Sequence, residues 1–244
     1  MKQNPFTIED LAAHTGIPAA DFREEPDLEV LMRFRSRNTY ARDAEGHFTG
    51  LNLCANGLRD EQLGFLTRLR NLQALNLGEN RLIRFGIPGE WQQIKYLNLS
   101  ENPSLRKLEF PQNGMADLEE LDLGECGLQN LGFSGEYPRL RKLDARGNTL
   151  ERVLIAADWP ELEFLDLAGN QLTEFTLPPG AGFDRLNYLF LDDNPLETPP
   201  KEILEQGREA TLRYLRELAA QGIREVFEVK LLIVGEGGTG KTTL

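Results

Sequence analysis

The stretch LQALNLGENRL, residues 72–82, decides the fold of this 244-residue chain, because variants of it recur through the middle of the sequence. Seven copies can be aligned, and their ninth positions are separated by steps of 22 or 24 residues. These ninth positions are Asn56, Asn80, Asn102, Cys126, Asn148, Asn170 and Asn194. A period of this length is typical of a solenoid, in which each repeat forms one coil that stacks on the next.

The chemistry within each copy explains how such a coil forms. Leucines alternate with polar residues, so a short strand turns Leu75 and Leu77 inward. The asparagine that follows also turns inward, where its amide can bond backbone groups that would otherwise be buried without partners. A thiol is small enough to take the same place at Cys126. This is the leucine-rich-repeat pattern, and it predicts an α/β solenoid shaped as a horseshoe, with parallel β-strands on the concave face.

The segments between the copies predict the opposite, convex side. Stretches such as FGIPGEW, FSGEYP and LPPGAGF are too rich in glycine and proline for helices, so we expect extended or turn segments there. Their aromatic residues are expected to fill the core. Stacked coils also need caps. Thr7 predicts a helix start near the N-terminus, residues 26–35 predict a second helix, and Gly207 divides two C-terminal helices.

Composition limits the classes of partner. The formal net charge is −12, which argues against nucleic acid or an anionic membrane surface, since both need clustered Lys and Arg. No apolar run suits a signal peptide or a membrane span. The only two cysteines, Cys54 and Cys126, lie far apart, as expected for a cytoplasmic protein without disulfides.

The strand face offers a candidate site for protein partners. The residues that alternate with the inward leucines are acidic, polar or aromatic, and the aromatics can supply burial while the acids steer a basic protein segment. The candidate partner-binding residues are Tyr96, Asn98, Glu120, Asp122, Asp144, Phe164, Asp166, Tyr188 and Phe190. A solvated face that confers only solubility is the alternative. A cation site at the aspartates is also conceivable, although Lys142 and Arg146 beside them favour a plain charge network.

The end of the chain carries a separate motif. GEGGTGKT, residues 235–242, matches G-x-x-x-x-G-K-[ST] and follows the apolar segment EVFEVKLLIV, as a phosphate-binding loop requires. Backbone amides of the loop would wrap phosphates, Lys241 would neutralise the β- and γ-phosphates, and Thr242 would hold Mg²⁺. The candidate nucleotide-binding residues are Gly235, Glu236, Gly237, Gly238, Thr239, Gly240, Lys241, Thr242 and Thr243.

Repeats, a helical linker such as EATLRYLREL and a strand leading into GEGGTGKTTL together resemble the Roco family, in its bacterial form. In that family leucine-rich repeats precede a Ras-like GTPase domain, Roc, and a dimerisation domain, COR. The resemblance implies that a longer protein binds GTP or GDP with Mg²⁺, hydrolyses GTP and forms a homodimer through COR. A repeat-bearing signalling ATPase of another class and a pure scaffold protein are the alternatives.

The resemblance also implies a division of the chain. Residues 1–47 would be an N-terminal helical cap, residues 48–198 seven repeats, residues 199–222 a C-terminal cap and linker, and residues 223–244 the start of a truncated Roc domain. We expect no catalytic residue and no bound cofactor in this fragment, because the rest of a nucleotide site would lie downstream. The fragment is expected to be a monomer, or to self-associate weakly through the apolar strand at its C-terminal end.

Overall fold

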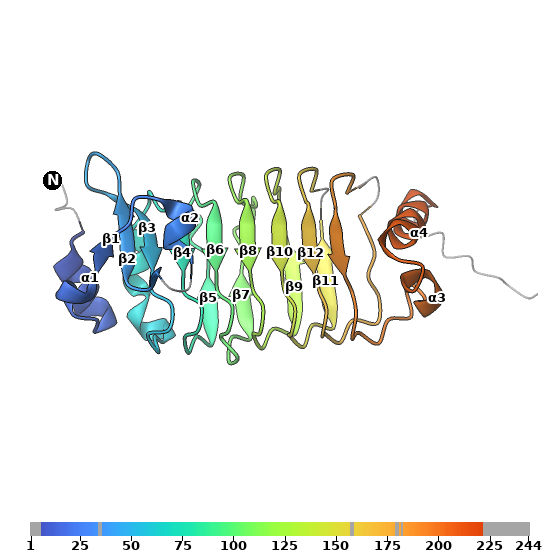
Figure 1. Ribbon diagram of the computed structural model, residues 1–244, viewed down its shortest axis with the longest axis horizontal. Helices are drawn as coiled ribbons and strands as arrows, with labels where there is room; N and C mark the ends of the chain where they lie inside the picture. Colours follow the sequence, from blue (N-terminus) through green and yellow to red (C-terminus); the bar gives the residue numbers. More distant parts are fainter. Residues whose placement is uncertain (1–5, 34–35, 157–158, 179–180, 182, 222–244) are drawn as a thin grey trace, which may run out of the picture.

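The computed structural model describes residues 6–33, 36–156, 159–178, 181 and 183–221. The solenoid follows the repeats. A nine-stranded sheet has the order β1-β2-β3-β4-β6-β8-β10-β12-β13 and runs the length of the molecule (Figure 1). One strand comes from each of the seven aligned copies: β3 (Phe48–Asn52), β4 (Ala74–Asn76), β6 (Tyr96–Asn98), β8 (Glu120–Asp122), β10 (Lys142–Asp144), β12 (Phe164–Asp166) and β13 (Tyr188–Phe190). These seven strands pair in parallel, which confirms the predicted leucine-rich-repeat solenoid.

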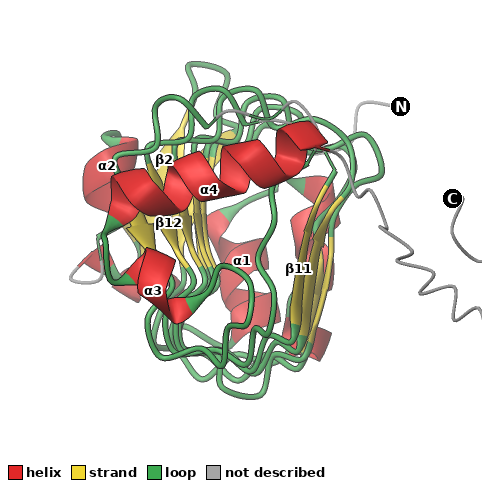
Figure 2. Ribbon diagram, turned by 90° about the vertical axis from the view of Figure 1, so that its right-hand side faces the viewer, coloured by secondary structure: helices red, strands yellow, loops and turns green. Residues whose placement is uncertain are grey.

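The return side of the coils is extended, as the glycine and proline content predicted. Two short parallel sheets form there, one from β5 (Arg84–Gly86) and β7 (Lys107–Glu109), the other from β9 (Asn130–Phe133) and β11 (Arg152–Ile155). Seen along the long axis, β11 and the main sheet lie on opposite sides of the coil (Figure 2). The first return segment differs, because it forms the 3-10 helices η3 (Asp60–Gln62) and η4 (Gly64–Arg68).

Leucines and large aromatic side chains fill the space between these two sides. The inward leucines of the main-sheet strands from β3 to β12 are fully buried, whereas Leu189 of β13 is partly buried. The aromatic residues Tyr137, Trp159 and Phe183 are also fully buried. The Trp159 ring stacks on Phe183 with centroids 6.0 Å apart and meets Tyr137 nearly edge-on. The predicted aromatic ladder is therefore a packing feature of the core.

In all but one of the stacked copies, an asparagine amide ties the coil to the one before it. In Asn80, Nδ2 donates to the carbonyl oxygens of Leu53 (3.0 Å) and Leu77 (2.9 Å), while Oδ1 accepts the N–H of Leu58 (2.9 Å). Equivalent contacts recur along the solenoid at Asn102, Asn148, Asn170 and Asn194. These side chains satisfy backbone groups that face the interior, where an unpaired polar group is costly.

The N-terminal cap differs in part from the sequence-based expectation. Helix α1 (Ile8–Thr15) begins at Thr7 with a capping box, as predicted. The second helix, α2 (Leu28–Leu31), is a single turn rather than a helix over residues 26–35. Around it the chain forms η1 (Ala19–Asp21), β1 (Arg23–Glu24) and β2 (Thr39–Arg42), and β2 runs antiparallel to β3.

The C-terminal cap consists of α3 (Lys201–Leu204) and α4 (Arg208–Gln221), which Gly207 separates at a φ of 89°. Only glycine adopts this backbone conformation at little cost. Helix α4 lies across the end of the solenoid (Figure 2). Its Arg208 donates to the carbonyl oxygen of Leu186 at 2.7 Å, and Leu212 and Leu215 are buried in the core.

In the described part of the chain, no helix is long and apolar enough to cross a membrane.

The asparagine ladder yields a stability prediction. Replacing Asn148 by alanine removes the donor to Leu123 and Ala145 and the acceptor for Leu128. We expect the free energy of unfolding to fall by about 3 kcal/mol, because several buried backbone groups lose their partners. Denaturant unfolding followed by circular dichroism measures this loss. The same substitution at the exposed Asn113 should cost less than about 0.5 kcal/mol, and equal losses at both positions would contradict the role of the ladder.

Candidate partner-binding face

Two columns of outward side chains make up the concave face. Because the strands pair in register, residues at equivalent positions stack across the sheet. The first column, before the central leucine of each strand, contains Gly50, Ala74, Tyr96, Glu120, Lys142, Phe164 and Tyr188. The second column, after that leucine, contains Asn52, Asn76, Asn98, Asp122, Asp144, Asp166 and Phe190. The nine candidate partner-binding residues all belong to these columns, from the third repeat onward.

Helix α2 covers the N-terminal end of this face, where it lies in front of the first strands (Figure 1). Its Leu28 and Leu31 pack on Gly50 so closely that an added Cβ would lie 2.7 Å from Leu28 and 2.8 Å from Leu31. Leu31 and Ala74 share a small buried cluster, against which Tyr96 packs. The face can therefore accept a partner only from about Tyr96 onward.

Amide groups of the second column hold the end of α2 in place. Asn52 Nδ2 donates to the carbonyl oxygen of Leu31 at 2.5 Å and to that of Arg33 at 3.1 Å. Asn76 Nδ2 donates to the carbonyl oxygen of Met32 at 3.0 Å. The carbonyl groups that a helix end leaves unpaired are thus bonded by the sheet. The sequence pattern placed these two asparagines outward correctly but did not reveal that α2 lies over them.

The second column also closes a turn at the end of each strand. In Asn98, Asp122, Asp144 and Asp166 one side-chain oxygen accepts the backbone N–H two residues later, at 2.8–3.2 Å. Asp144 and Asp166 are only 4% and 8% exposed. A partner therefore has less access to these two carboxylates than the alternating pattern predicted, and both contribute to the fold.

The carboxylates of this column influence one another. Burial raises the pKa of Asp122, and the nearby Asp144 carboxylate adds to the rise. Burial also raises the pKa of Asp166, again with a contribution from Asp144. Asp144 itself lies 3.1 Å from the guanidinium of Arg146. The predicted charge network is therefore present at Asp144, while Asp122 and Asp166 are charged at some cost to the folded state.

A trough runs beside the second column, past the strand ends. It encloses about 310 Å³, and its lining residues are Cys54, Asn76, Gly78, Glu79, Asn98, Ser100, Glu101, Asp122, Gly124, Glu125 and Arg146. Small residues at Gly78, Ser100 and Gly124 leave the space open. Three glutamates follow its length at left-handed backbone positions, with φ between 53° and 55°. Burial raises the pKa of Glu79, and the neighbouring Glu101 raises it further.

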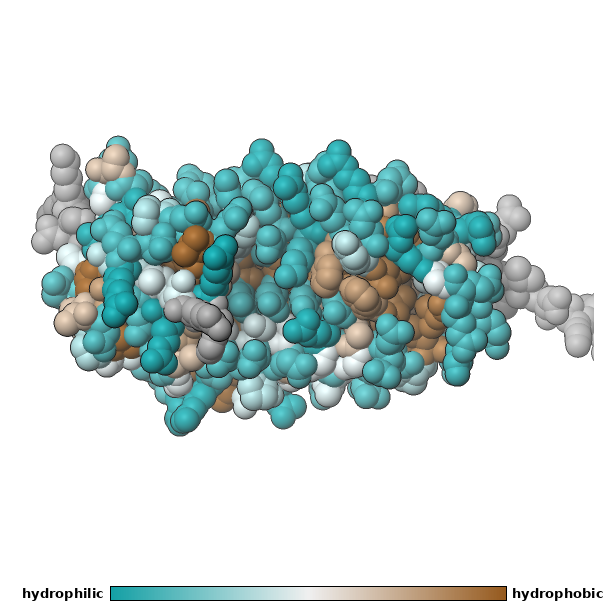
Figure 3. All heavy atoms as spheres, in the orientation of Figure 1, coloured by the Kyte–Doolittle hydropathy of each residue, from teal (hydrophilic) through white to brown (hydrophobic). Residues whose placement is uncertain are grey.

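Aromatic side chains gather at the C-terminal end of the face. The Phe164 ring lies 6.1 Å from the ring of Tyr188 and 5.7 Å from that of Phe190. Lys142 Nζ lies 5.5 Å from the Phe164 ring centroid. Tyr188 is 59% exposed and Phe190 37%. The hydrophobic area on this part of the face is visible in Figure 3. We call Phe164, Tyr188 and Phe190 the aromatic patch.

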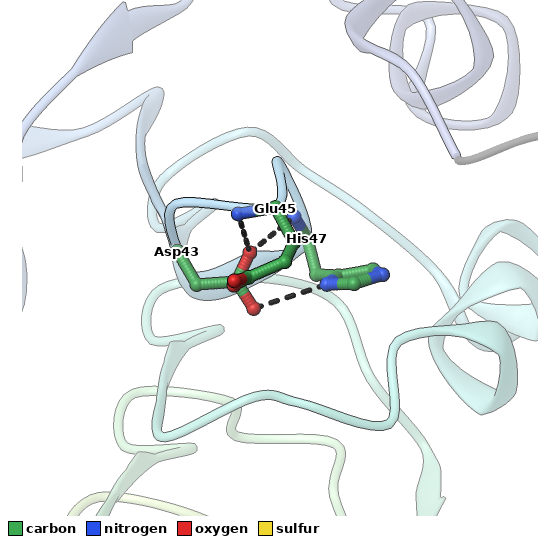
Figure 4. A group of neighbouring side chains, drawn as sticks. All are labelled: Asp43, Glu45 and His47. Carbon is green, nitrogen blue, oxygen red and sulfur yellow. Dashed lines mark hydrogen bonds and ion pairs between the residues drawn. The ribbon is translucent and has the colours of Figure 1, made fainter.

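A further polar group lies in the turn between β2 and β3 (Figure 4). Asp43, Glu45 and His47 bring their ligand-type atoms within 4.8 Å of one another. Asp43 Oδ1 accepts the backbone N–H groups of Glu45 (3.1 Å) and His47 (2.8 Å), and Oδ2 lies 3.0 Å from His47 Nδ1 and 3.2 Å from Asn71 Nδ2. These contacts close the turn, so the arrangement has a structural explanation without a metal.

The candidate nucleotide-binding residues, from Gly235 to Thr243, lie outside the described residues. So does the apolar C-terminal segment through which weak self-association was predicted. Both stay predictions from the sequence.

Comparison with known proteins connects the solenoid to larger molecules. No family model matches the chain. The chain is 30% identical over 295 residues to a Roc-COR-CHAT protease from an unknown prokaryotic organism, a match that covers 98% of this chain and 27% of that protein. It is 32% identical over 144 residues to Toll-like receptor 2 type-2 of Gallus gallus, covering 57% of this chain and 18% of the receptor. The chain is 33% identical over 141 residues to vasorin of Homo sapiens, a match that covers 53% of this chain and 20% of vasorin. The chain thus spans between 18% and 27% of the length of these relatives.

The raised pKa values predict the effect of neutralising the second column. In Asp122→Asn the amide oxygen keeps the turn bond, as Asn98 does in the preceding coil. Since the folded-state pKa of Asp122 is raised, its ionisation destabilises the fold at neutral pH. We expect Asp122→Asn to add about 0.5–1 kcal/mol of stability at pH 7.

The gain should fade as the pH falls toward the ordinary aspartate value of 3.8, because the wild-type carboxyl group then becomes neutral as well. Thermal unfolding at several pH values measures it. Asp144→Asn is the matched control and should give no gain, because Asp144 pairs with Arg146. A loss of stability in Asp122→Asn at pH 7 would contradict this account of the column.

Proposed function

Because this chain belongs to the Roco family of leucine-rich-repeat proteins, we propose that its solenoid is the interaction and regulatory module of a multidomain GTPase. The module binds protein partners, or the GTPase domain of the same protein, through the open part of the concave face. We place it in the cytoplasm, because its two cysteines, Cys54 and Cys126, are buried and form no disulfide with each other. Homodimerisation of the longer protein would come from a COR domain.

One observation carries the proposal. In the second column the first three strands carry asparagine and the next three carry aspartate, although both residues close the same turn. Burial and mutual repulsion raise the pKa values of Asp122 and Asp166, so these carboxylates are less favourable there than amides would be. Negative charge retained against this cost supports a role in attracting a cationic partner.

The composition of the face supports the same conclusion. Glu120 is exposed in the first column, and exposed aromatic rings follow it toward the C-terminal end. Aromatic side chains supply most of the binding energy in many protein interfaces, whereas surrounding charges set the rate and orientation of encounter. A face that served only solubility would not need the aromatic patch.

For the protein as a whole we propose GTP binding and hydrolysis. The support is the complete motif from Gly235 to Thr242, together with the similarity to a protein whose name includes Roc and COR. In this reading Lys241 contacts the β- and γ-phosphates and Thr242 coordinates Mg²⁺. The alternatives are an ATP-dependent signalling protein and a scaffold without nucleotide chemistry.

Charge reversal tests the interaction face. Glu120 is exposed in the first column, and Glu163 is the exposed residue directly before Phe164 at the start of β12. The double variant Glu120→Lys and Glu163→Lys should reduce crosslinked capture of protein partners at least about tenfold, because it removes negative charge from the open face and its edge. Quantitative mass spectrometry of the captured proteins measures the change. The matched control reverses the exposed Glu136 and Glu151, which lie in the return segments on the other side of the coil. Equal capture by the wild type and both double variants would exclude this face.

A lysine substitution tests the nucleotide proposal in a protein that contains the full Ras-like domain. Lys241→Ala should weaken GTP binding by at least about a hundredfold, because the phosphate charge loses its main partner. Titration with a fluorescent GTP analogue and Mg²⁺ measures the affinity. Arg213→Ala also removes one positive charge, from an exposed position on α4, and should leave the affinity unchanged. Unaltered GTP affinity in Lys241→Ala would refute the assigned role.

A further inference from the structure

The concave face already holds one segment of polypeptide. Helix α2 places Leu28 and Leu31 on Gly50, and the sheet donates from Asn52 and Asn76 to the backbone carbonyl groups at the end of the helix. The face therefore holds α2 in two ways. Apolar side chains of the helix pack on the first column, and its backbone carbonyl groups accept hydrogen bonds from the second column. Beyond Met32 the same two columns continue without a covering segment in the described residues.

The aromatic patch is where the uncovered face most resembles an interface. The Phe164 ring of β12 contacts both Tyr188 and Phe190 of β13. In the described part of the chain, the other exposed large hydrophobic residues, Ile83 and Leu154, lie in return segments of different coils. Single exposed apolar residues are ordinary on a protein surface, but a contiguous aromatic group is a common mark of a binding site. The patch can bury an apolar side chain of a partner.

Negative charge lies at a defined distance from this patch. The trough is centred on the third repeat, at Glu101, with Glu79 and Glu125 on either side. The patch is centred between the sixth and seventh repeats. Measured across the strands, three and a half strand spacings of about 4.8 Å separate the two centres by about 17 Å, which an extended chain spans in about five residues.

We propose that the open concave face docks a segment with two anchors: an aromatic or large aliphatic side chain on the patch of Phe164, Tyr188 and Phe190, and a cationic side chain about five residues away in the trough at Glu101. This inference rests on the proposed function and specifies the partner for it. The segment crosses the strands beside α2. Charge complementarity selects the cationic anchor, because the trough carries four carboxylates and a single arginine, Arg146, which already pairs with Asp144.

Asn98 gives this docking mode a polar contact. It is the next rung after Asn76 in the second column, and its Oδ1 accepts from the backbone N–H and the hydroxyl of Ser100. Because Oδ1 faces this turn, Nδ2 of Asn98 faces away from it. In Asn52 and Asn76 the same Nδ2 atom donates to a carbonyl oxygen of the α2 segment. A carbonyl group of the docked segment is the natural acceptor for it.

Two labelled peptides of identical composition test the proposal with the 244-residue chain. In the first, a pair of arginines and a tryptophan are separated by about five residues; in the second, they are adjacent. Fluorescence anisotropy should show that the first peptide binds about tenfold more tightly, because only it reaches both anchors. The double variant Tyr188→Ser and Phe190→Ser should abolish this preference, and Glu101→Lys should do the same from the other end.

The matched control is Leu154→Ser, which removes an exposed apolar residue (66% exposed) from the return side and should keep the preference. Circular dichroism verifies that each variant is folded. Equal binding of both peptides to the wild type, or an unchanged preference in the patch variant, would overturn the two-anchor site. If the Glu120 and Glu163 reversals still reduce partner capture in that case, the proposed function stands without the two-anchor site; if capture is also unaffected, both proposals fall.

Discussion

A coil can close on itself only if the backbone groups that turn toward the interior find partners there. Asparagine solves this with one planar amide, which donates to two carbonyl groups and accepts one N–H across neighbouring coils, as Asn148 and Asn170 both do. Where it occurs, the same contact fixes how one coil stacks on the next, and so helps to set the register of the strands. The flat ladder of outward residues, including the acids and the aromatic patch, depends on that register.

Among the six copies that follow another copy, only Cys126 departs from the asparagine ladder, and it shows how local the requirement is. Cys126 donates from Sγ to the carbonyl oxygen of Leu99 at 3.2 Å, but it has no amide oxygen to accept an N–H group of the preceding coil, as the asparagines do. In that preceding coil, the N–H of Leu105 donates instead to the carbonyl oxygen of Asn102, in a turn at Pro103 and Ser104. A coil can therefore do without the amide when its own backbone supplies the missing partner.

Local periodicity carried most of the prediction of the fold, and long-range packing accounts for what it missed. The strands, the ladder and the break at Gly207 follow from residue spacing, because each is decided within one repeat. The placement of α2 over Gly50 could not be predicted that way, since it joins segments far apart in the sequence. Alternation likewise predicted that Asp144 and Asp166 point outward, but not that their turns leave them buried.

Two residues of the aromatic patch lie in the coil against which the C-terminal cap packs. Tyr188 and Phe190 form β13, and a few residues earlier the carbonyl oxygen of Leu186 accepts from Arg208, while Asp184 lies 3.3 Å from Arg216. A partner seated on the patch therefore contacts the coil on which α4 is fixed. The glycine-rich motif begins fourteen residues after the end of α4, from Gln221 to Gly235. Among the repeats, the last therefore lies nearest in sequence to the proposed GTPase domain, and a partner on the patch would contact the part of the solenoid closest in the chain to that domain.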